Sequence, residues 1–365
     1  MTWSGRDAPY PEPKATHTMA RTGRPWTDHK PPPAAPIWDV IEGLGRFHVL
    51  VSAIELGVFD ALETTGAVTV EALATRLGAS VRHLQALVQA LAGMGFVEHC
   101  GERYDLNDTS RRYLTSSGAA TMAALVPVAP GPLVNWSNLT ETVRRGRPAR
   151  PIEDDPVSFY APLVRGTFAT ILRCAQRADR QLSYSTLSEP RVLDIAAGLA
   201  PWSIAVLTSN PGATAVINDL PEILAAAEPL LADHLLTDRV ELRPGDLHDI
   251  SLEPDHYDLA VLGHVCRAEP DRLGRELVER AAAALRPGGR MLLTDYFLDR
   301  QVELEPHAAM MNVTIAASTR EGRCRTADEY AGWMRAGGLH NIRLIEPIGF
   351  QRVLVGRRPA DEEWK

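Results

Sequence analysis

The stretch RVLDIAAGLAPWS, residues 191–203, decides the fold of this chain. A short apolar run ends at Asp194, and the small residues Ala196, Gly198 and Ala200 lead into a second apolar segment. This pattern predicts a strand, a tight turn and the start of a helix. In an open α/β sheet, such a junction directs backbone N–H groups into the crevice beyond the strand ends, where ligands bind.

Acids at the ends of three successive predicted strands indicate the ligand. Asp194 ends the first strand, Asp219 in AVINDLP ends the second, and Asp246 in RPGDL follows the third. A carboxylate at the first position would repel the pyrophosphate of a dinucleotide. S-adenosylmethionine carries no phosphate, and its sulfonium and ammonium groups are cationic. The acids therefore predict S-adenosylmethionine as the cofactor, with Asp219 accepting hydrogen bonds from the ribose hydroxyls.

Strands and helices alternate from here to the C-terminus and predict an α/β, Rossmann-like sheet. The connections are long enough for crossover helices, so the strands should be parallel. Thr326 and Glu329 give the capping-box pattern of a last helix, which Gly337 and Gly338 end. The segment IRLIEPIGFQRVLVGR (342–357) then predicts two further strands, the last of them antiparallel. The five earlier strands are expected at 191–195, 214–218, 239–243, 258–263 and 290–295.

The N-terminal part has a different character. Residues 1–36 are rich in proline, threonine, arginine and lysine, so we expect a disordered leader or an arm that orders on a partner chain. From Ile37 the apolar residues recur at helical spacing. Residues 69–114 alternate two short helices with a β-ribbon, which is the pattern of a winged helix-turn-helix. Five arginines there are balanced by five acids, which argues against DNA reading.

Composition excludes several classes of protein. The chain has 365 residues and a net charge of −8, which argues against nucleic acid or an anionic membrane as the main partner. Four cysteines form no C-x-x-C pair, so we expect reduced thiols and a cytoplasmic location. There is no apolar run long enough for a membrane helix and no signal-peptide pattern.

From Ile37 to its end, the chain resembles the class I S-adenosylmethionine-dependent methyltransferases of the plant caffeate and bacterial polyketide O-methyltransferase type. The resemblance implies a seven-stranded methyltransferase sheet, a preceding winged-helix domain that forms a homodimer, and methylation of a small natural-product acceptor. The matching pieces are VLDIAAG (192–198), NDLPEIL (218–224), RVELRPGDL (239–247), YDLAVLGHVCRAEPD (257–271), LRPGGRMLLTDYF (285–297) and the tail from RTADEY at 325.

The resemblance also divides the chain and implies the cofactor contacts. It predicts a leader at 1–36, a dimerisation domain at 37–115, a helical linker that roofs the pocket at 116–185 and a catalytic domain at 186–365. The implied residues for the methionine end, the ribose and the adenine are Asp194 with Gly198, Asp219 with Leu220, and Asp246 with Leu247, with Ala196 and Gly263 as further contacts. Where the family has acid-x-Gly-x-Gly-x-Gly, two glycines are alanine here, which restricts φ and adds methyl groups beside the cofactor.

The acceptor side departs from the family pattern. The family removes the acceptor proton with a histidine after the fourth strand, but Arg267 stands at that position. Arginine cannot be a general base. Ala268 replaces the neighbouring acid, and the two helper positions fall on Asp295 and Cys324.

Three interpretations remain open for catalysis. An acceptor that is already ionised, or a nucleophilic carbon, could react by alignment alone, with Arg267 stabilising negative charge. Alternatively, His264 or His307 is the base. Third, the fold could bind the cofactor and catalyse a rearrangement or hydroxylation without methyl transfer. A different class of function is a winged-helix regulator that senses a small molecule.

The acceptor itself should contact four residues. Phe159 and Tyr160 lie in the linker whose helices roof the pocket in the family, and Met311 and Asn312 lie on the helix that lines it. No metal is expected, because no close spacing of histidines and carboxylates supports a metal site.

Overall fold

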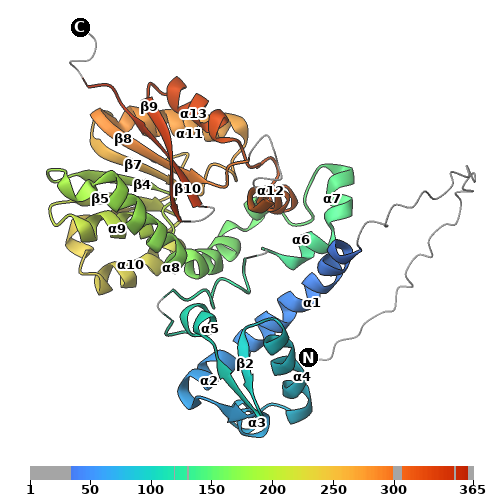
Figure 1. Cartoon of the computed structure of the whole chain (residues 1–365). Coiled ribbons are helices and arrows are strands. Elements are labelled where there is room, and N and C mark those ends of the chain that lie inside the picture. The colour runs from blue at the N-terminus through green and yellow to red at the C-terminus, as the bar shows by residue number, and fades with distance from the viewer. Residues whose placement is uncertain (1–33, 119, 130, 299–305, 349–350, 361–365) are drawn as a thin grey trace, which may run out of the picture. The chain divides into compact units, whose positions relative to one another are not determined.

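A computed structural model describes residues 34–118, 120–129, 131–298, 306–348 and 351–360 (Figure 1). Nearly all of the predicted leader lies outside these ranges, except that Ala35 and Pro36 belong to the first helix. The chain divides into two compact units, residues 1–45 and 46–365. The first contains the start of helix α1 (Ala35–Glu55), whose helical spacing was predicted. Its exposed apolar side chains are Ile37, Trp38, Val40, Ile41 and Leu44.

The second unit begins with a small module of helices and a three-stranded sheet of order β1-β3-β2. Thr69 caps α3 by accepting the N–H of Ala72, and buried Phe59, Leu73 and Val88 lie in the module's core. The two helices and β-ribbon predicted at 69–114 are α3, α4 and β2–β3. The elements are α2 (Val58–Thr65), β1 (Val68–Thr69), α3 (Val70–Leu77), α4 (Val81–Gly93), β2 (Val97–Cys100), β3 (Arg103–Leu106) and α5 (Asp108–Tyr113).

Three helices follow, namely α6 (Leu133–Ser137), α7 (Leu139–Arg145) and the long α8 (Pro156–Leu182). Helix α8 starts with Pro156 in its first turn, and the Asp155 side chain caps it by accepting the Ser158 N–H at 3.2 Å. It ends at Leu182 and is capped by Ser183, which has a left-handed φ of 56°.

A seven-stranded sheet of order β6-β5-β4-β7-β8-β10-β9 forms the rest of the chain. The neighbouring strands β6, β5, β4, β7 and β8 run parallel to one another, and β10 is antiparallel to its neighbours β8 and β9. The predicted fold class and the antiparallel last strand are thus confirmed. The strands are β4 (Arg191–Ile195), β5 (Thr214–Asp219), β6 (Val240–Pro244), β7 (Tyr257–Gly263), β8 (Leu285–Asp295), β9 (His340–Ile348) and β10 (Gln351–Arg357).

Helices cover both faces of this sheet (Figure 1). Alternate residues of a strand enter different cores: Val192 of β4 packs with α8, α9 and α10, whereas Leu193 packs with α11 and α13. The predicted capping box of Thr326 and Glu329 is present at the start of α13. The helices are α9 (Pro201–Ser209), α10 (Pro221–Asp233), α11 (Asp271–Ala284), α12 (Pro306–Ser318) and α13 (Ala327–Ala336).

Within the described ranges, each helix is too short or too polar to cross a membrane.

Candidate active site

The turn between β4 and α9 is built from residues with left-handed backbone. Ala196, Gly198 and Ala200 have φ angles of 53°, 61° and 56°. At Gly198 a Cβ atom would lie 3.1 Å from Cγ1 of Val164 on α8, so both the backbone and the close approach favour glycine there. For each alanine this conformation costs roughly 1 kcal/mol or more. The turn therefore keeps the shape expected of a glycine-rich loop, although alanine stands at two of the expected glycine positions.

Asp219, at the end of β5, fastens this turn. One carboxylate oxygen accepts the Gly198 N–H and the other accepts the Leu220 N–H, both at 2.7 Å. Burial raises the pKa of Asp219, and the two backbone donors oppose that increase. Each oxygen still has a lone pair. The carboxylate can therefore hold the turn and accept ligand hydroxyls together.

Asp194 lies at the end of β4 and is 1% exposed. Its Oδ2 accepts the backbone N–H of Ser203 at 3.3 Å and the Ser203 hydroxyl at 2.7 Å. Burial raises the pKa of Asp194 to about 7, although the Ser203 donors lower it. A cationic ligand nearby would favour the ionised form. Ser203 was missed at the sequence level, although its place in the first turn of a helix was a usable signal.

The third acid shapes the loop after β6. Asp246 is exposed, and its Oδ1 accepts the N–H of His248 at 2.8 Å. Arg280 of α11 donates to the carbonyl oxygens of Leu247 and His248 at 3.2 and 2.9 Å. Arg280 thus fixes the backbone beside Asp246 and Leu247, the two residues predicted to flank the adenine.

A histidine–carboxylate pair beside this loop was not predicted. Nε2 of His248 lies 2.8 Å from Oε2 of Glu269, and the pair joins the loop after β6 to the loop after β7. Both side chains are largely covered. The two residues are 21 positions apart, and no local pattern relates them.

The end of β7 carries Gly263 and His264. A Cβ atom on Gly263 would lie 3.2 Å from Nε1 of Trp202, so the indole packs directly on this backbone. His264 has a φ of 61°, which is unusual for a residue other than glycine. Burial and the charge of Arg267 lower the pKa of His264 to about 4. The imidazole is therefore neutral at physiological pH, and its Nδ1 is buried without a hydrogen-bond partner.

The Arg267 side chain is largely buried and paired. Its Nη1 lies 3.0 Å from Oδ1 of Asp295, and the two side chains are 13% and 0% exposed. The same nitrogen donates to the His264 carbonyl oxygen at 2.5 Å. The guanidinium carbon lies 5.5 Å from the centre of the Tyr296 ring. The structure thus brings together the predicted residues His264, Arg267 and Asp295.

Phe159 and Tyr160 lie in α8 with their ring centres 5.0 Å apart and nearly perpendicular. Burial raises the pKa of Tyr160 to about 12, and the charges of Arg267 and Asp219 both act on its hydroxyl. Tyr160 is therefore within electrostatic reach of the predicted cofactor residues and of the acceptor side.

Helix α12 contributes the remaining predicted residues. Oδ1 of Asn312 accepts the N–H of Cys324 at 2.8 Å, which fixes the backbone at one helper position. Met311 is half-buried, and His307 is exposed in the first turn. Burial raises the pKa of the Cys324 thiol to about 12.

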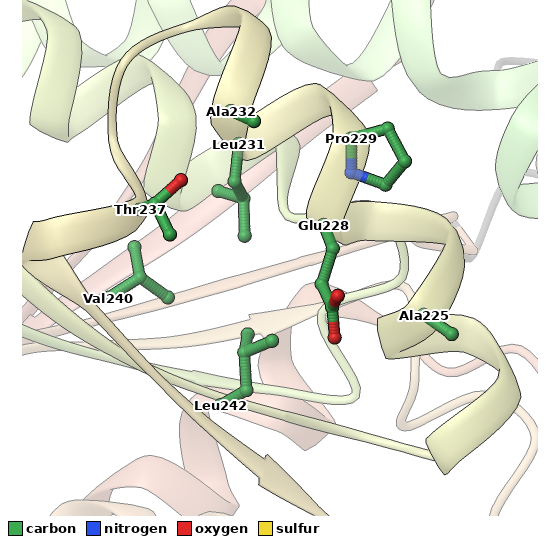
Figure 2. Close-up of a pocket in the computed structure, with 8 residues that line it drawn as sticks. All are labelled: Ala225, Glu228, Pro229, Leu231, Ala232, Thr237, Val240 and Leu242. Atoms are coloured by element: carbon green, nitrogen blue, oxygen red, sulfur yellow. The ribbon is translucent and has the colours of Figure 1, made fainter.

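The described residues include no group of three or more His, Cys, Asp or Glu side chains arranged to hold a metal ion. A cavity of about 420 Å³ lies between α10 and the edge strand β6 (Figure 2). Its lining is mainly apolar, with Glu228 as its one acid. None of the predicted cofactor or acceptor residues lines it, so it is separate from the candidate site.

Comparison with known proteins identifies the class. The O-methyltransferase dimerisation domain matches residues 38–116, and the O-methyltransferase domain matches residues 169–340. The 3-hydroxy-5-methyl-1-naphthoate 3-O-methyltransferase of Streptomyces sahachiroi is 27% identical over 84% of this chain and 90% of its own. The mitomycin biosynthesis 6-O-methyltransferase of Streptomyces lavendulae is 27% identical over 85% and 90%. Human N-acetylserotonin methyltransferase, solved with S-adenosylmethionine, covers 92% of this chain and 100% of its own with a TM-score of 0.78 at 20% identity.

The chain is therefore an S-adenosylmethionine-dependent methyltransferase. It belongs to the O-methyltransferase family with an N-terminal dimerisation domain. The turn after β4 fits this cofactor, because Asp219 offers carboxylate oxygens beside the left-handed backbone at Gly198, and Asp194 supplies a buried acid for a cationic group at the end of the same strand. The cofactor supplies an electrophilic methyl group.

Proposed function

We propose that the protein methylates a hydroxyl oxygen of a small aromatic acceptor of natural-product type and works as a homodimer in the cytoplasm. The names of the two Streptomyces relatives support this acceptor class, since they act on a hydroxynaphthoate and in mitomycin biosynthesis. Phe159 and Tyr160, with their perpendicular rings on α8, are suited to pack against an aromatic acceptor.

One observation carries the cofactor assignment. Asp219 links the turn after β4 to the end of β5 by accepting the Gly198 N–H, which gathers the predicted methionine and ribose contacts in one place. In this proposal Asp194 faces the cationic end, Asp219 and Leu220 hold the ribose, and Asp246 and Leu247 flank the adenine. Ala196 and Gly263 provide close backbone approach.

The matched dimerisation domain supports the homodimer, as do the apolar side chains that α1 exposes. Free thiols at all four cysteines suit a reducing cytoplasm. We assign no DNA-reading role to α4, because Gln85 donates to the Tyr104 hydroxyl and His83 lies 2.9 Å from the Ser80 hydroxyl. In this proposal the dimerisation domain spans residues 37–115, the helical linker 116–185 and the catalytic domain 186–365, after a leader at 1–36.

Asp219→Ala tests the cofactor assignment. We expect S-adenosylhomocysteine to bind roughly 10- to 150-fold more weakly, because two ribose hydroxyls lose an ionised acceptor. Isothermal titration calorimetry measures this, and circular dichroism checks that the variant is folded. Glu228→Ala, which removes an exposed acid from the separate cavity, is the matched control and should bind as the wild type does. Unchanged affinity in folded Asp219→Ala would contradict the assignment.

A further inference from the structure

The Asp295 carboxylate is fully used as a hydrogen-bond acceptor. Its two oxygens accept the Arg267 backbone N–H at 3.0 Å, Arg267 Nη1 at 3.0 Å, the Tyr296 N–H at 2.9 Å and the Tyr330 hydroxyl at 3.0 Å. An ionised carboxylate has about four lone-pair positions. Protonation would break at least one of these bonds in a buried place. Asp295 therefore holds Arg267 in position instead of acting as a base.

The loop around Arg267 is fixed from behind. Arg325, which is 0% exposed, donates to the carbonyl oxygens of Cys266 and Glu269 at 2.8 Å each. Gly322 packs so closely that a Cβ there would lie 2.7 Å from the Arg267 carbonyl oxygen. These contacts hold the backbone of the loop, so Arg267 stays at its position.

The other titratable groups near Arg267 do not suit proton removal at neutral pH. His264 has a pKa of about 4 because of burial and the Arg267 charge, so it would hold an abstracted proton poorly. Burial raises the pKa values of Tyr160 and Cys324 to about 12, so both keep their protons. Burial also raises the pKa values of Tyr296 and Tyr330. Glu269 is paired with His248.

Two buried nitrogens here have no hydrogen-bond partner in the part of the chain that the structure describes. They are Nε of Arg267 and Nδ1 of His264. Both residues contact the Tyr296 ring, at 5.5 and 5.6 Å. The Arg267 Nε–H is a cationic donor that lacks an acceptor, and an anionic oxygen reaching it would recover the lost hydrogen-bond energy.

We propose that the acceptor reacts as an oxyanion, having lost its hydroxyl proton to solvent, and that the donors around Arg267 favour this ionised form. The proposal depends on the oxygen methylation proposed above and names the acceptor class as acidic phenols and naphthols. The acceptor oxygen forms a bond to the methyl carbon while the carbon–sulfur bond breaks and its electron pair stays on sulfur. The negative charge of the oxygen and the positive charge of the sulfonium disappear together, and no proton moves at the site.

The first test is a spectroscopic titration without turnover. A series of naphthols, with pKa values lowered by nitro and halogen substituents from about 10 to about 7, is bound to the enzyme with S-adenosylhomocysteine. We expect the pKa of the bound naphthol, read from the absorbance of its anion, to lie at least about one unit below the pKa of the free naphthol. Such a shift means that the site binds the anion about tenfold more tightly than the neutral form. Arg267→Gln should lose this shift, and Arg272→Gln, which removes an exposed arginine from the first turn of α11, should keep it. A bound naphthol that stays neutral in the wild type would overturn the proposal.

The second test needs only wild-type enzyme and covers the case in which Arg267→Gln does not fold. With labelled S-adenosylmethionine, kcat/KM should rise about tenfold per pH unit up to an inflexion that moves with the pKa of each acceptor. An inflexion fixed at one pH for all acceptors, and removed by His264→Gln, His248→Gln or His307→Gln, would overturn the proposal and identify a base. Failure of every acceptor to be methylated would overturn the proposed oxygen methylation together with it.

Discussion

The loop after β4 and the loop after β7 end neighbouring parallel strands, yet they are held in different ways. In the first, Asp219 binds backbone N–H groups, and the shape of the turn depends on left-handed residues. The second loop is held by a buried ion pair between the side chains of Arg267 and Asp295. Backbone geometry survives the change of glycine to alanine, so the cofactor loop keeps its form. A side-chain arrangement changes with its residues, so we propose that the loop after β7 uses different chemistry.

The largest effect expected from this contrast concerns Asp194. Its pKa of about 7 lies above the usual 3.8, so the unliganded folded protein binds a proton that the unfolded chain has lost. The free energy of unfolding should therefore fall as pH rises from about 4 to about 7. A cationic cofactor favours ionised Asp194, so its affinity should rise up to about tenfold per pH unit between pH 5.5 and 7, with one proton released.

Calorimetry in two buffers of different ionisation enthalpy measures that proton release. Asp194→Asn is the control and should bind the cofactor with little dependence on pH in this range. If the wild type binds equally well from pH 5.5 to 7 and releases no proton, Asp194 does not face the cationic end of the cofactor.

A smaller effect tests the backbone of the same loop. Ala196→Gly should stabilise the protein by about 0.5 to 1 kcal/mol, because relief of the left-handed strain exceeds the added chain entropy of glycine. Urea unfolding measures this change. Ala205→Gly, in the right-handed helix α9, should destabilise by about 1 kcal/mol or more. A loss of stability of equal size in both variants would show that Ala196 is not strained.

Local pattern was sufficient for the sheet and for the turn after β4. Strands β4 to β7 begin and end within one residue of their predicted bounds, because apolar runs and strand-end acids are local signals. Strand β8 begins at Leu285, five residues before the prediction, since pairing with Tyr257 overrides the turn signal of the Pro-Gly-Gly that follows it.

The missed contacts are long-range. His248 with Glu269 and Arg325 with Cys266 join residues 21 and 59 positions apart, and only the fold brings them together. The departure at Arg267 was visible in the sequence. Its burial against Asp295 was not, because no periodicity tells whether an arginine in a loop faces solvent or a buried carboxylate.

The central claim is that the cofactor side is complete without Arg267, whereas methyl transfer depends on that residue. Arg267→Lys tests it most directly, because a lysine ammonium can replace Nη1, which donates to Asp295 and His264, but has no counterpart of the Nε–H proposed to meet the acceptor oxygen. Titration with S-adenosylhomocysteine and a rate assay with labelled cofactor are run on the same preparation. We predict an affinity within about twofold of wild type and a kcat lowered by at least about tenfold. Unchanged kcat in Arg267→Lys and in Arg267→Ala would contradict the account.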